Sequence, residues 1–273
     1  MSGWVETRVG RITVVGATCA VFILCWEGLI AATGLNAIIL PRPFDVAWAF
    51  WDGLFVRGVF WPHIAVTFGE IVGGFFIGGI LGLVLGLAIG QVRFLQIALL
   101  PYLIAIESTP KIAVAPLFVI WFGFGFQSKI ALAALMCFFP LVINVISGMR
   151  ATDPHRIEML TAFSGNQRQI FWWVTVPSAL PFIFAGMRIA IVLSVIGAIV
   201  AEFVGARSGL GYLVLLYNFD FNLSGMFAIL IVLSILGILL NYLVEYIESI
   251  VVFWEGRRRN TNTRSISIRK QEV

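Results

Sequence analysis

Six long apolar stretches restrict what this chain can fold into more than any other feature. They cover residues of about 12–33, 64–90, 97–122, 129–149, 178–203 and 225–252. A helix of about 20 apolar residues crosses the hydrocarbon core of a bilayer and satisfies its own backbone hydrogen bonds there. The chain is 60% hydrophobic and 12% charged, whereas soluble domains average roughly 45–50% and 25%. The sequence therefore predicts an all-α integral membrane domain with six transmembrane helices, which occupies residues 12–256.

The first apolar stretch could be a signal peptide, and the cysteines in the apolar stretches could bind a metal or form disulfides. The first one follows Arg11 and has no small-x-small cleavage site, which favours a retained span over a cleaved signal peptide. The three cysteines lie in apolar runs without CxxC or CxH spacing, so we expect no metal site and no disulfide. They are Cys19, Cys25 and Cys137.

Glycines and prolines mark how the spans are expected to pack. Span two carries a face of small residues that allows close helix contact: Gly73, Gly74, Gly78, Gly79, Gly82, Gly86 and Gly90. Spans three and four are joined by the short turn 123–129 and are predicted to form a hairpin. Both are interrupted by prolines, which membrane helices tolerate where protein or a cavity satisfies the freed backbone groups: Pro101, Pro110, Pro116 and Pro140.

The distribution of basic residues predicts the orientation, because cytoplasmic loops are enriched in Lys and Arg. With the N-terminus inside, the inner segments hold Arg8, Arg11, Arg93, Arg150, Arg156, Arg168, Arg257, Arg258, Arg259, Arg264, Arg269 and Lys270. The outer loops then hold only Arg42, Arg57, Lys129 and Arg207. Both termini, segment 1–11 and tail 257–273, are therefore expected to be cytoplasmic. The outer segment 35–62 is expected to include a stretch on the membrane surface with three tryptophans at headgroup level: Trp48, Trp51 and Trp61.

The same count makes 150–177 the largest internal cytoplasmic loop, and its sequence is unusually polar. Asp153-Pro154 predicts a helix start, with Asp as N-cap and Pro in the first turn. Gly165 suits a left-handed turn, Asn166 can cap a second short helix, and Pro177 is expected to open span five. Taken alone, this pattern fits either a helix lying in the headgroups or a docking element for a cytoplasmic partner.

The spacing inside this loop resembles the EAA motif of binding-protein-dependent ABC importer permeases. Glu158, Met159 and Leu160 take the Glu-Ala-Ala places, and the ending V-T-V-P closes at Pro177. Ser164 stands where that family has Gly, with Gly165 one place later. The stretches LPRPFDV, TPKIAVAPLFVIWFGFG, FFPLVINVISGMRATDP and IGAIVAEFVGARSGLGYL are similar to the nitrate/sulfonate/taurine branch over nearly the whole chain. Within it, the PKIAVAPLFVIWFGFG run resembles permeases for pyrimidine vitamin precursors and riboflavin.

The resemblance implies a MetI-like, type I importer permease in a bacterial inner membrane. It implies a second permease subunit, expected to be another copy of the chain, two cytoplasmic ATPase subunits and an external substrate-binding protein. Membrane lipid is expected around the chain, and neither nucleic acid nor a cofactor is. The segment 153–173 would be the coupling helix that meets the ATPase. The residues implied in coupling are Arg156, Glu158, Ser164, Gly165, Arg168 and Pro177.

An independent check on the residues supports the need for a separate ATPase. A phosphate-binding P-loop needs Gly-Lys-[Ser/Thr], and none of the three lysines follows a glycine. His63 and His155 have no plausible nucleophile or metal partner nearby in sequence. We therefore expect a transport subunit and not an enzyme, with any ATP hydrolysis supplied by a partner.

Four polar residues within the spans are candidates for the pathway: Glu107, Lys111, Asn144 and Glu202. Glu107 and Lys111 stand at i and i+4 around Pro110, where they either pair on one helix face or line a pathway beside a broken backbone. Glu202 precedes the glycine-rich loop GARSGLGY, which is either a plain turn or a flexible seat for the binding protein. Arg188 is expected to reach toward the cytoplasmic boundary.

Two other classes of protein compete with this interpretation. A secondary transporter would need no ATPase and would carry inverted repeats and an ion site at mid-membrane, and the two halves of the chain show no such duplication. A membrane-embedded enzyme would show clustered His, Asp or Glu within spans. The substrate stays open between a small anion (nitrate, a sulfonate or taurine) and a pyrimidine or vitamin precursor.

Overall fold

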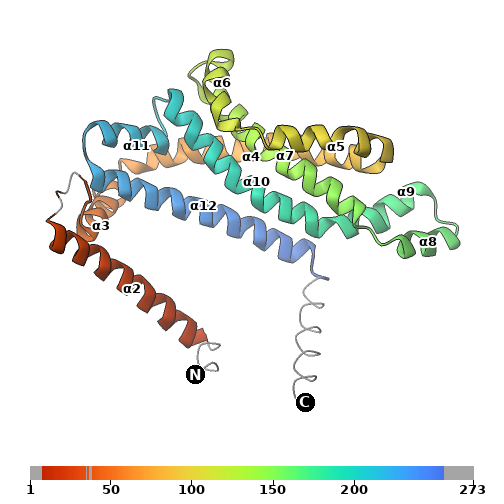
Figure 1. Ribbon diagram of the computed structural model, residues 1–273, viewed down its shortest axis with the longest axis horizontal. Helices are drawn as coiled ribbons and strands as arrows, with labels where there is room; N and C mark the ends of the chain where they lie inside the picture. Colours follow the sequence, from red (N-terminus) through yellow and green to blue (C-terminus); the bar gives the residue numbers. More distant parts are fainter. Residues whose placement is uncertain (1–7, 35, 37–38, 255–273) are drawn as a thin grey trace.

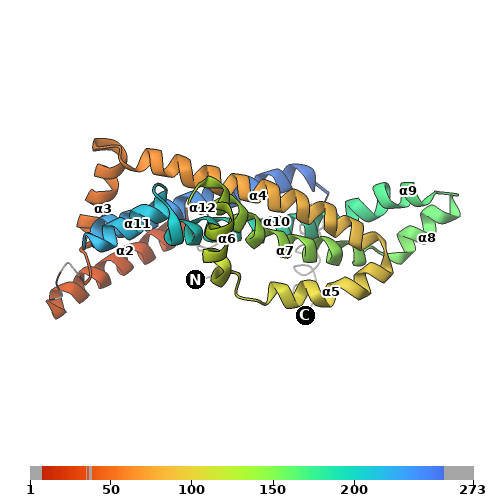
Figure 2. The ribbon, with the colours of Figure 1, turned by 90° about the horizontal axis from the view of Figure 1, so that it is seen from above.

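The computed structural model describes residues 8–34, 36 and 39–254, and every regular element in that part of the chain is helical. The longest elements are α2 (Arg8–Thr33), α4 (Phe60–Gln91), α7 (Phe126–Arg150), α10 (Val176–Gly205) and α12 (Leu223–Val251). The shorter ones are α3 (Pro43–Trp51), α8 (Pro154–Ala162), α9 (Gln167–Ile170) and α11 (Leu210–Phe219). Figures 1 and 2 show α4, α7, α10 and α12 side by side along the long axis, with α2 at the edge. The predicted all-α class is confirmed.

Five helices in the described part are long and apolar enough to cross a membrane. They are Ile12–Thr33, Phe60–Gln91, Phe126–Arg150, Gln167–Gly205 and Leu223–Val251. The sixth predicted span is broken: α5 (Arg93–Glu107) and the segment Lys111–Phe122 meet at 77°. That segment is a 3₁₀ turn, Lys111–Val114, followed by α6 (Ala115–Phe122).

The prolines of spans three and four have different effects. Pro110 lies in the break between α5 and α6, outside any helix, where the missing N–H costs no helical hydrogen bond. Pro101 and Pro140 lie inside α5 and α7, which both continue past them. Only Pro110 therefore coincides with an interruption of its span.

Helix α7 forms the centre of the domain. In its most apolar window 61% of residues are buried, compared with 28% for α4 and 33% for α12. It packs along both α4 and α10. Its buried leucines, valines and alanines therefore contribute to several apolar clusters, which include the inner faces of these two neighbours.

Contact between α4 and α7 depends on a glycine at every fourth position of α4. The buried glycines of this stripe are Gly74, Gly78, Gly82 and Gly86. A Cβ at Gly78 would lie 2.3 Å from the Ala134 carbonyl oxygen and 2.5 Å from Cys137 Sγ. Backbones approach this closely only where side chains are absent. The predicted small-residue face is therefore the α7 contact, although a Cβ at Gly79 would meet only Leu141 Cδ2, at 4.0 Å.

Two predicted segments are described only in part. The outer segment contains α3 and a π-helical turn, Asp52–Val56, and each of its three tryptophans is more than half exposed, at 59%, 53% and 57%. Their position at headgroup level stays a prediction. The tail 257–273, with its basic residues, and residues 1–7 of the N-terminal segment lie outside the described residues.

The glycine stripe predicts that substitutions at two neighbouring glycines differ in their effect on stability. Gly78→Ala forces a methyl group into the α7 backbone, and overpacking of this kind costs about 1–3 kcal/mol. Gly79→Ala adds the same methyl group where the nearest atom, Leu141 Cδ2, is 4.0 Å away. We expect Gly78→Ala to lower the thermal unfolding midpoint of the purified protein in detergent and Gly79→Ala to leave it unchanged. Equal midpoints for the two variants would contradict close α4–α7 packing.

Candidate functional site

The polar segment after α7 folds into two short helices with local caps. Helix α8 begins after Asp153, whose side chain accepts a hydrogen bond from the His155 N–H at 3.0 Å. Helix α9 begins after Asn166, which accepts from the Gln169 N–H at 2.9 Å, while Gln169 Oε1 accepts from the Asn166 N–H at 2.8 Å. This reciprocal pair is a capping box. The predicted helix starts at Asp153 and Asn166 are both confirmed.

The bend between α8 and α9 is a Schellman motif, with one difference from the sequence-based expectation. The Ser164 N–H donates to Thr161 O and the Gly165 N–H donates to Leu160 O, both at 2.9 Å. In this motif the residue after the C-cap takes the left-handed conformation, and that residue is Ser164, with φ of 61°. The prediction that Gly165 supplies the left-handed turn is therefore wrong. The helix ends one residue earlier than the glycine suggested, so the strained position falls on the serine.

Gly165 is needed at the bend for a different reason. A Cβ there would lie 2.7 Å from both Leu160 Cγ and Leu160 O, the same carbonyl that accepts the Gly165 hydrogen bond. A side chain at this position would therefore separate the two ends of the motif. The bend combines a residue under backbone strain with a residue that has no room for a side chain.

The second helix of the segment is continuous with the long α10. A π-helical turn, Phe171–Thr175, joins α9 to α10, and the Val176 N–H bonds to Phe171 O across it. Pro177 then falls in the first turn of α10, where its missing N–H is tolerated. The expectation that Pro177 opens span five is confirmed for α10. The expected division between span five and the second short helix is wrong, because the chain stays helical over Gln167–Gly205. The wider π turn shifts the hydrogen-bond register just before the proline.

Helices α8 and α9 project from one end of the bundle, as Figure 2 shows. Helix α8 has no buried residue. Met159 and Phe163 are 59% and 78% exposed. Glu158 pairs weakly with His155 at 3.5 Å, whereas the exposed Arg156 and Arg168 have no side-chain partner in the described part of the chain. This end therefore presents two free guanidinium groups beside exposed apolar side chains.

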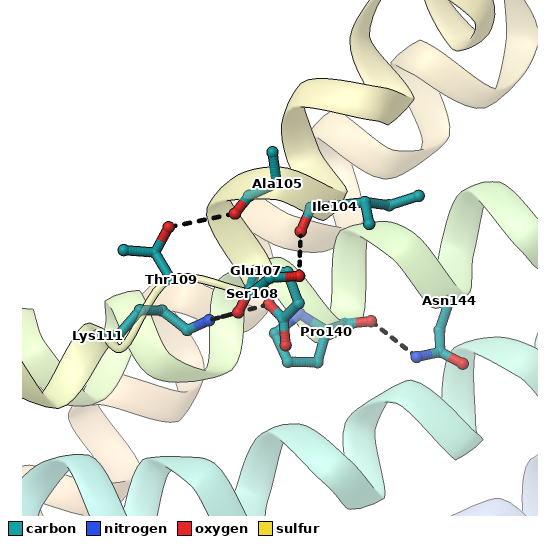
Figure 3. Close-up of polar contacts among 8 residues, drawn as sticks. All are labelled: Ile104, Ala105, Glu107, Ser108, Thr109, Lys111, Pro140 and Asn144. Carbon is teal, nitrogen blue, oxygen red and sulfur yellow. Dashed lines mark hydrogen bonds and ion pairs between the residues drawn. The ribbon is translucent and has the colours of Figure 1, made fainter.

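The break in span three brings two of the predicted pathway residues together. Lys111 Nζ donates to Glu107 O at 2.6 Å and lies 3.2 Å from Glu107 Oε2, as Figure 3 shows. The ammonium group thus satisfies the end of α5 and pairs with its last side chain. It also lies 5.6 Å from the centre of the Phe139 ring of α7. The Lys111 side chain is only 10% exposed, compared with 31% for Glu107.

Asn144 lies on α7 and is separate from the Glu107–Lys111 pair. Its Nδ2 donates to Pro140 O at 2.8 Å, within its own helix (Figure 3). Its Cβ faces Gly186 of α10, where an added Cβ would come within 2.7 Å of it. Asn144 is half-buried at this α7–α10 contact.

Glu202 of α10 is buried next to the start of α11, where it accepts hydrogen bonds from neighbouring hydroxyl and N–H groups. It is 1% exposed, accepts a hydrogen bond from Thr67 Oγ1 at 2.6 Å, and also accepts from the Gly211 N–H. Thr67 in turn accepts from the Leu210 N–H at 2.7 Å. A carboxylate at a helix N-terminus is favourable because it satisfies free N–H groups. Glu202 and Thr67 therefore fasten α11 to α10 and α4.

Three further polar groups surround this junction. The Gly209 N–H donates to His63 Nδ1 at 3.0 Å. Lys129, 2% exposed, donates to the carbonyls of Phe124, Gly125 and Gly205. Glu70 is 2% exposed, and its Oε2 has no hydrogen-bond partner in the described part of the chain.

The sequence patterns do not single out Thr67 or Lys129 for any role. The prediction that Lys129 is a loop residue is wrong, because Lys129 is buried within α7. It donates to the loop carbonyls of Phe124 and Gly125 and to the last carbonyl of α10, that of Gly205. One feature of the sequence could have indicated that these charged residues lie near one another. Alternating span directions place Glu70, Lys129 and Glu202 at the same end of their helices.

Arg188 does not end in open solvent. Its guanidinium bonds to Glu248 Oε2 and lies 4.0 Å from Glu245 Oε1, both on α12. The Arg188 side chain, which we expected to extend toward the cytoplasmic boundary, is thus held by an ion pair between α10 and α12. No group of three or more potential metal ligands occurs among the described residues.

Comparisons with known proteins agree with this architecture. Residues 78–251 match the family described as binding-protein-dependent transport system inner membrane component. The chain is 36% identical over 239 residues to a riboflavin transport system permease protein of Chloroflexus aurantiacus, covering 88% of this chain and 89% of that protein. It is 34% identical over 220 residues to a formylaminopyrimidine transport permease protein of Halalkalibacterium halodurans, covering 81% and 87%. A putative aliphatic sulfonates transport permease protein of Bacillus subtilis is 32% identical over 237 residues, covering 87% and 86%.

A solved structure shares the fold. A chain of the MetNI methionine ABC transporter, in inward-facing conformations, superimposes with a TM-score of 0.56 at 24% identity, covering 72% of this chain and 96% of that one. The MetI-like fold that the sequence resemblance implied is confirmed. With its apolar helices and these matches, the chain belongs to the family of binding-protein-dependent transport system inner membrane components and is a multi-pass permease subunit of the ABC importer type.

Proposed function

We propose that this chain forms the substrate pathway of an ATP-driven importer and is moved by separate ATPase subunits through α8 and α9. One observation carries the proposal: the exposed α9 continues without a break into α10, over Gln167–Gly205. A force on α9 therefore acts directly on a helix that packs against the central α7. The domain would then switch between two states whose balance depends on contacts with the ATPase.

The surface of α8 and α9 suits a protein partner better than a role within this chain. Met159 and Phe163 are exposed, and Arg156 and Arg168 are free to meet acidic groups. Fully buried aromatic and arginine side chains dominate the binding energy of protein interfaces. The six residues that the EAA resemblance implied remain the proposed coupling set. Within it, Ser164 and Gly165 shape the bend, Pro177 lies at the helix joint, and the others face outward.

We propose further that the pathway passes the break between α5 and α6. Broken helices in transporters provide binding groups where the backbone lines a cavity. Here Lys111 would attract an anionic substrate group, Glu107 would tune its charge, and Asn144 would add a polar contact from α7. The contacts of Glu202 favour a different role for it, namely holding α11 in place at the opposite end from α8.

The partners and substrate follow from the same family. A second permease subunit, proposed to be another copy, would complete the pathway, and an external binding protein would deliver the substrate. Both termini would then be cytoplasmic in a bacterial inner membrane. The relatives are named for riboflavin, a formylaminopyrimidine and aliphatic sulfonates, so the proposed substrate is a small organic nutrient or anion of this kind.

The bend between α8 and α9 provides a test of coupling with a built-in control. Gly165→Ala places a methyl group against Leu160 and should distort the bend, so we expect loss of most co-purifying ATPase and of substrate-stimulated ATP hydrolysis. Ser164→Gly removes a left-handed strain of about 1–2 kcal/mol and should preserve or improve both. Gel filtration must show that both variants are folded. A folded Gly165→Ala protein with full ATPase retention would refute docking through this bend.

The pathway proposal is testable by chemical labelling, without knowledge of the substrate. Ser108 at the break and Ser234 in α12 are both exposed serines whose hydroxyls bond to the carbonyl four residues earlier, at 3.0 Å and 2.8 Å. In a background with the native cysteines replaced by serine, we expect a charged, membrane-impermeant thiol reagent to label Ser108→Cys at least about tenfold faster than Ser234→Cys, because only a hydrated thiolate reacts. Equal rates would place the break in lipid and remove it from the pathway.

A further inference from the structure

A cavity of about 750 Å³ lies at the end of the bundle that carries α8. It is lined by the end of α4, by residues 93–104 of α5, by the end of α7 and by Ile157 of α8. Its polar lining residues are Gln91, Arg93, Gln96, Arg150 and Thr152. No aspartate or glutamate lines it in the described part of the chain. The cavity therefore has a net positive lining beside the bundle end proposed for coupling.

The two arginines in this cavity differ from the two arginines of the domain that have carboxylate partners. Arg57 is paired with Asp52, and Arg188 with Glu248. Arg93 and Arg150 are exposed, and their side chains have neither an ion-pair nor a hydrogen-bond partner among the described residues. Two guanidinium groups that share a cavity without a counter-charge favour an anion between them, and phosphate is a group that they bind through paired hydrogen bonds.

Thr152 gives a second, independent indication of a ligand. The residue is 7% exposed and lines the cavity, yet its hydroxyl has no hydrogen-bond partner in the part of the chain that the structure describes. Buried hydroxyls in proteins are nearly always paired, so one without a partner calls for an explanation. A ligand oxygen entering beside Arg150 would supply the missing partner.

The remaining wall of the cavity is apolar and continues along α5. Ile97, Leu100, Pro101 and Ile104 line it from this helix. Helix α5 has no buried residue, and Ile97 is 69% exposed. Both views place α5 at the periphery of the bundle (Figures 1 and 2). A free inorganic anion would gain nothing from this wall, whereas an acyl chain would cover it.

We propose that this cavity binds the phosphate headgroup of an anionic phospholipid between Arg93 and Arg150, with an acyl chain along α5. Basic pockets between transmembrane helices recognise anionic headgroups in this way. The site lies where α5, α7 and α8 meet. A bound lipid would therefore contact both the helix before the proposed pathway break and the proposed coupling helix. The proposal does not depend on the transported substrate or on ATP hydrolysis.

Native mass spectrometry of the full-length chain in a neutral detergent tests this directly, with phosphatidylglycerol and phosphatidylcholine as probes. We expect the unmodified chain to bind phosphatidylglycerol preferentially. The double variant Arg93→Gln/Arg150→Gln should bind it about thirtyfold more weakly with unchanged binding of phosphatidylcholine. The matched control Arg42→Gln/Arg207→Gln removes two exposed arginines that lie outside the cavity and should behave like the unmodified chain. Thr152→Val should weaken phosphatidylglycerol binding by a smaller factor.

Three results would overturn the proposal. Equal loss of phosphatidylglycerol in the control variant would show a general charge effect. Full displacement of the lipid by excess inorganic phosphate would show a site for free anions. Unchanged phosphatidylglycerol binding in a folded Arg93→Gln/Arg150→Gln protein, as judged by gel filtration, would show that the cavity does not hold the headgroup.

Discussion

Within a bilayer there is no water to bond an exposed backbone group, so every interruption of a helix must provide its own partners. Three charged side chains in the spans of this permease lie where that requirement arises. Lys111 bonds to the last carbonyl of α5 at the break in span three. Glu202 accepts a hydrogen bond from an N–H at the start of α11, and Lys129 donates to two loop carbonyls and to the last carbonyl of α10. Each of these three charges thus provides hydrogen-bond partners for backbone groups at the end of a helix or in a loop.

The same requirement supports the proposal that α10 transmits a movement of α9. Its α9 extension needs no side-chain support along its length, because the π-helical turn before Pro177 keeps the chain helical. One end carries the capped α8–α9 bend, and the other end is fastened through Glu202 to α11 and α4. In between, the helix packs along α7. A displacement of α9 can therefore reach both the core and the far end of the domain.

Local chemistry was predictable from the sequence, and contacts between distant residues were not. The apolar lengths and the caps at Asp153 and Asn166 depend on neighbouring residues, and the structure has them as expected. The left-handed position fell on Ser164 because the exact end of α8 depends on the hydrogen bonds of the whole bend, and a glycine one residue away was the stronger signal. The partner of Glu202 is Thr67, 135 residues away, and no spacing rule connects them.

The central claim is that α9 and α10 move as one rigid helix when the ATPase subunits close. It is tested most directly by electron paramagnetic resonance on the reconstituted importer, with spin labels at Arg168→Cys in α9 and, separately, at Phe203→Cys near the far end of α10. The account predicts that ATP binding changes the distance between the two copies of the permease at both positions. A change at residue 168 with a constant distance at residue 203 would show that the helix bends at its π turn and would contradict the account.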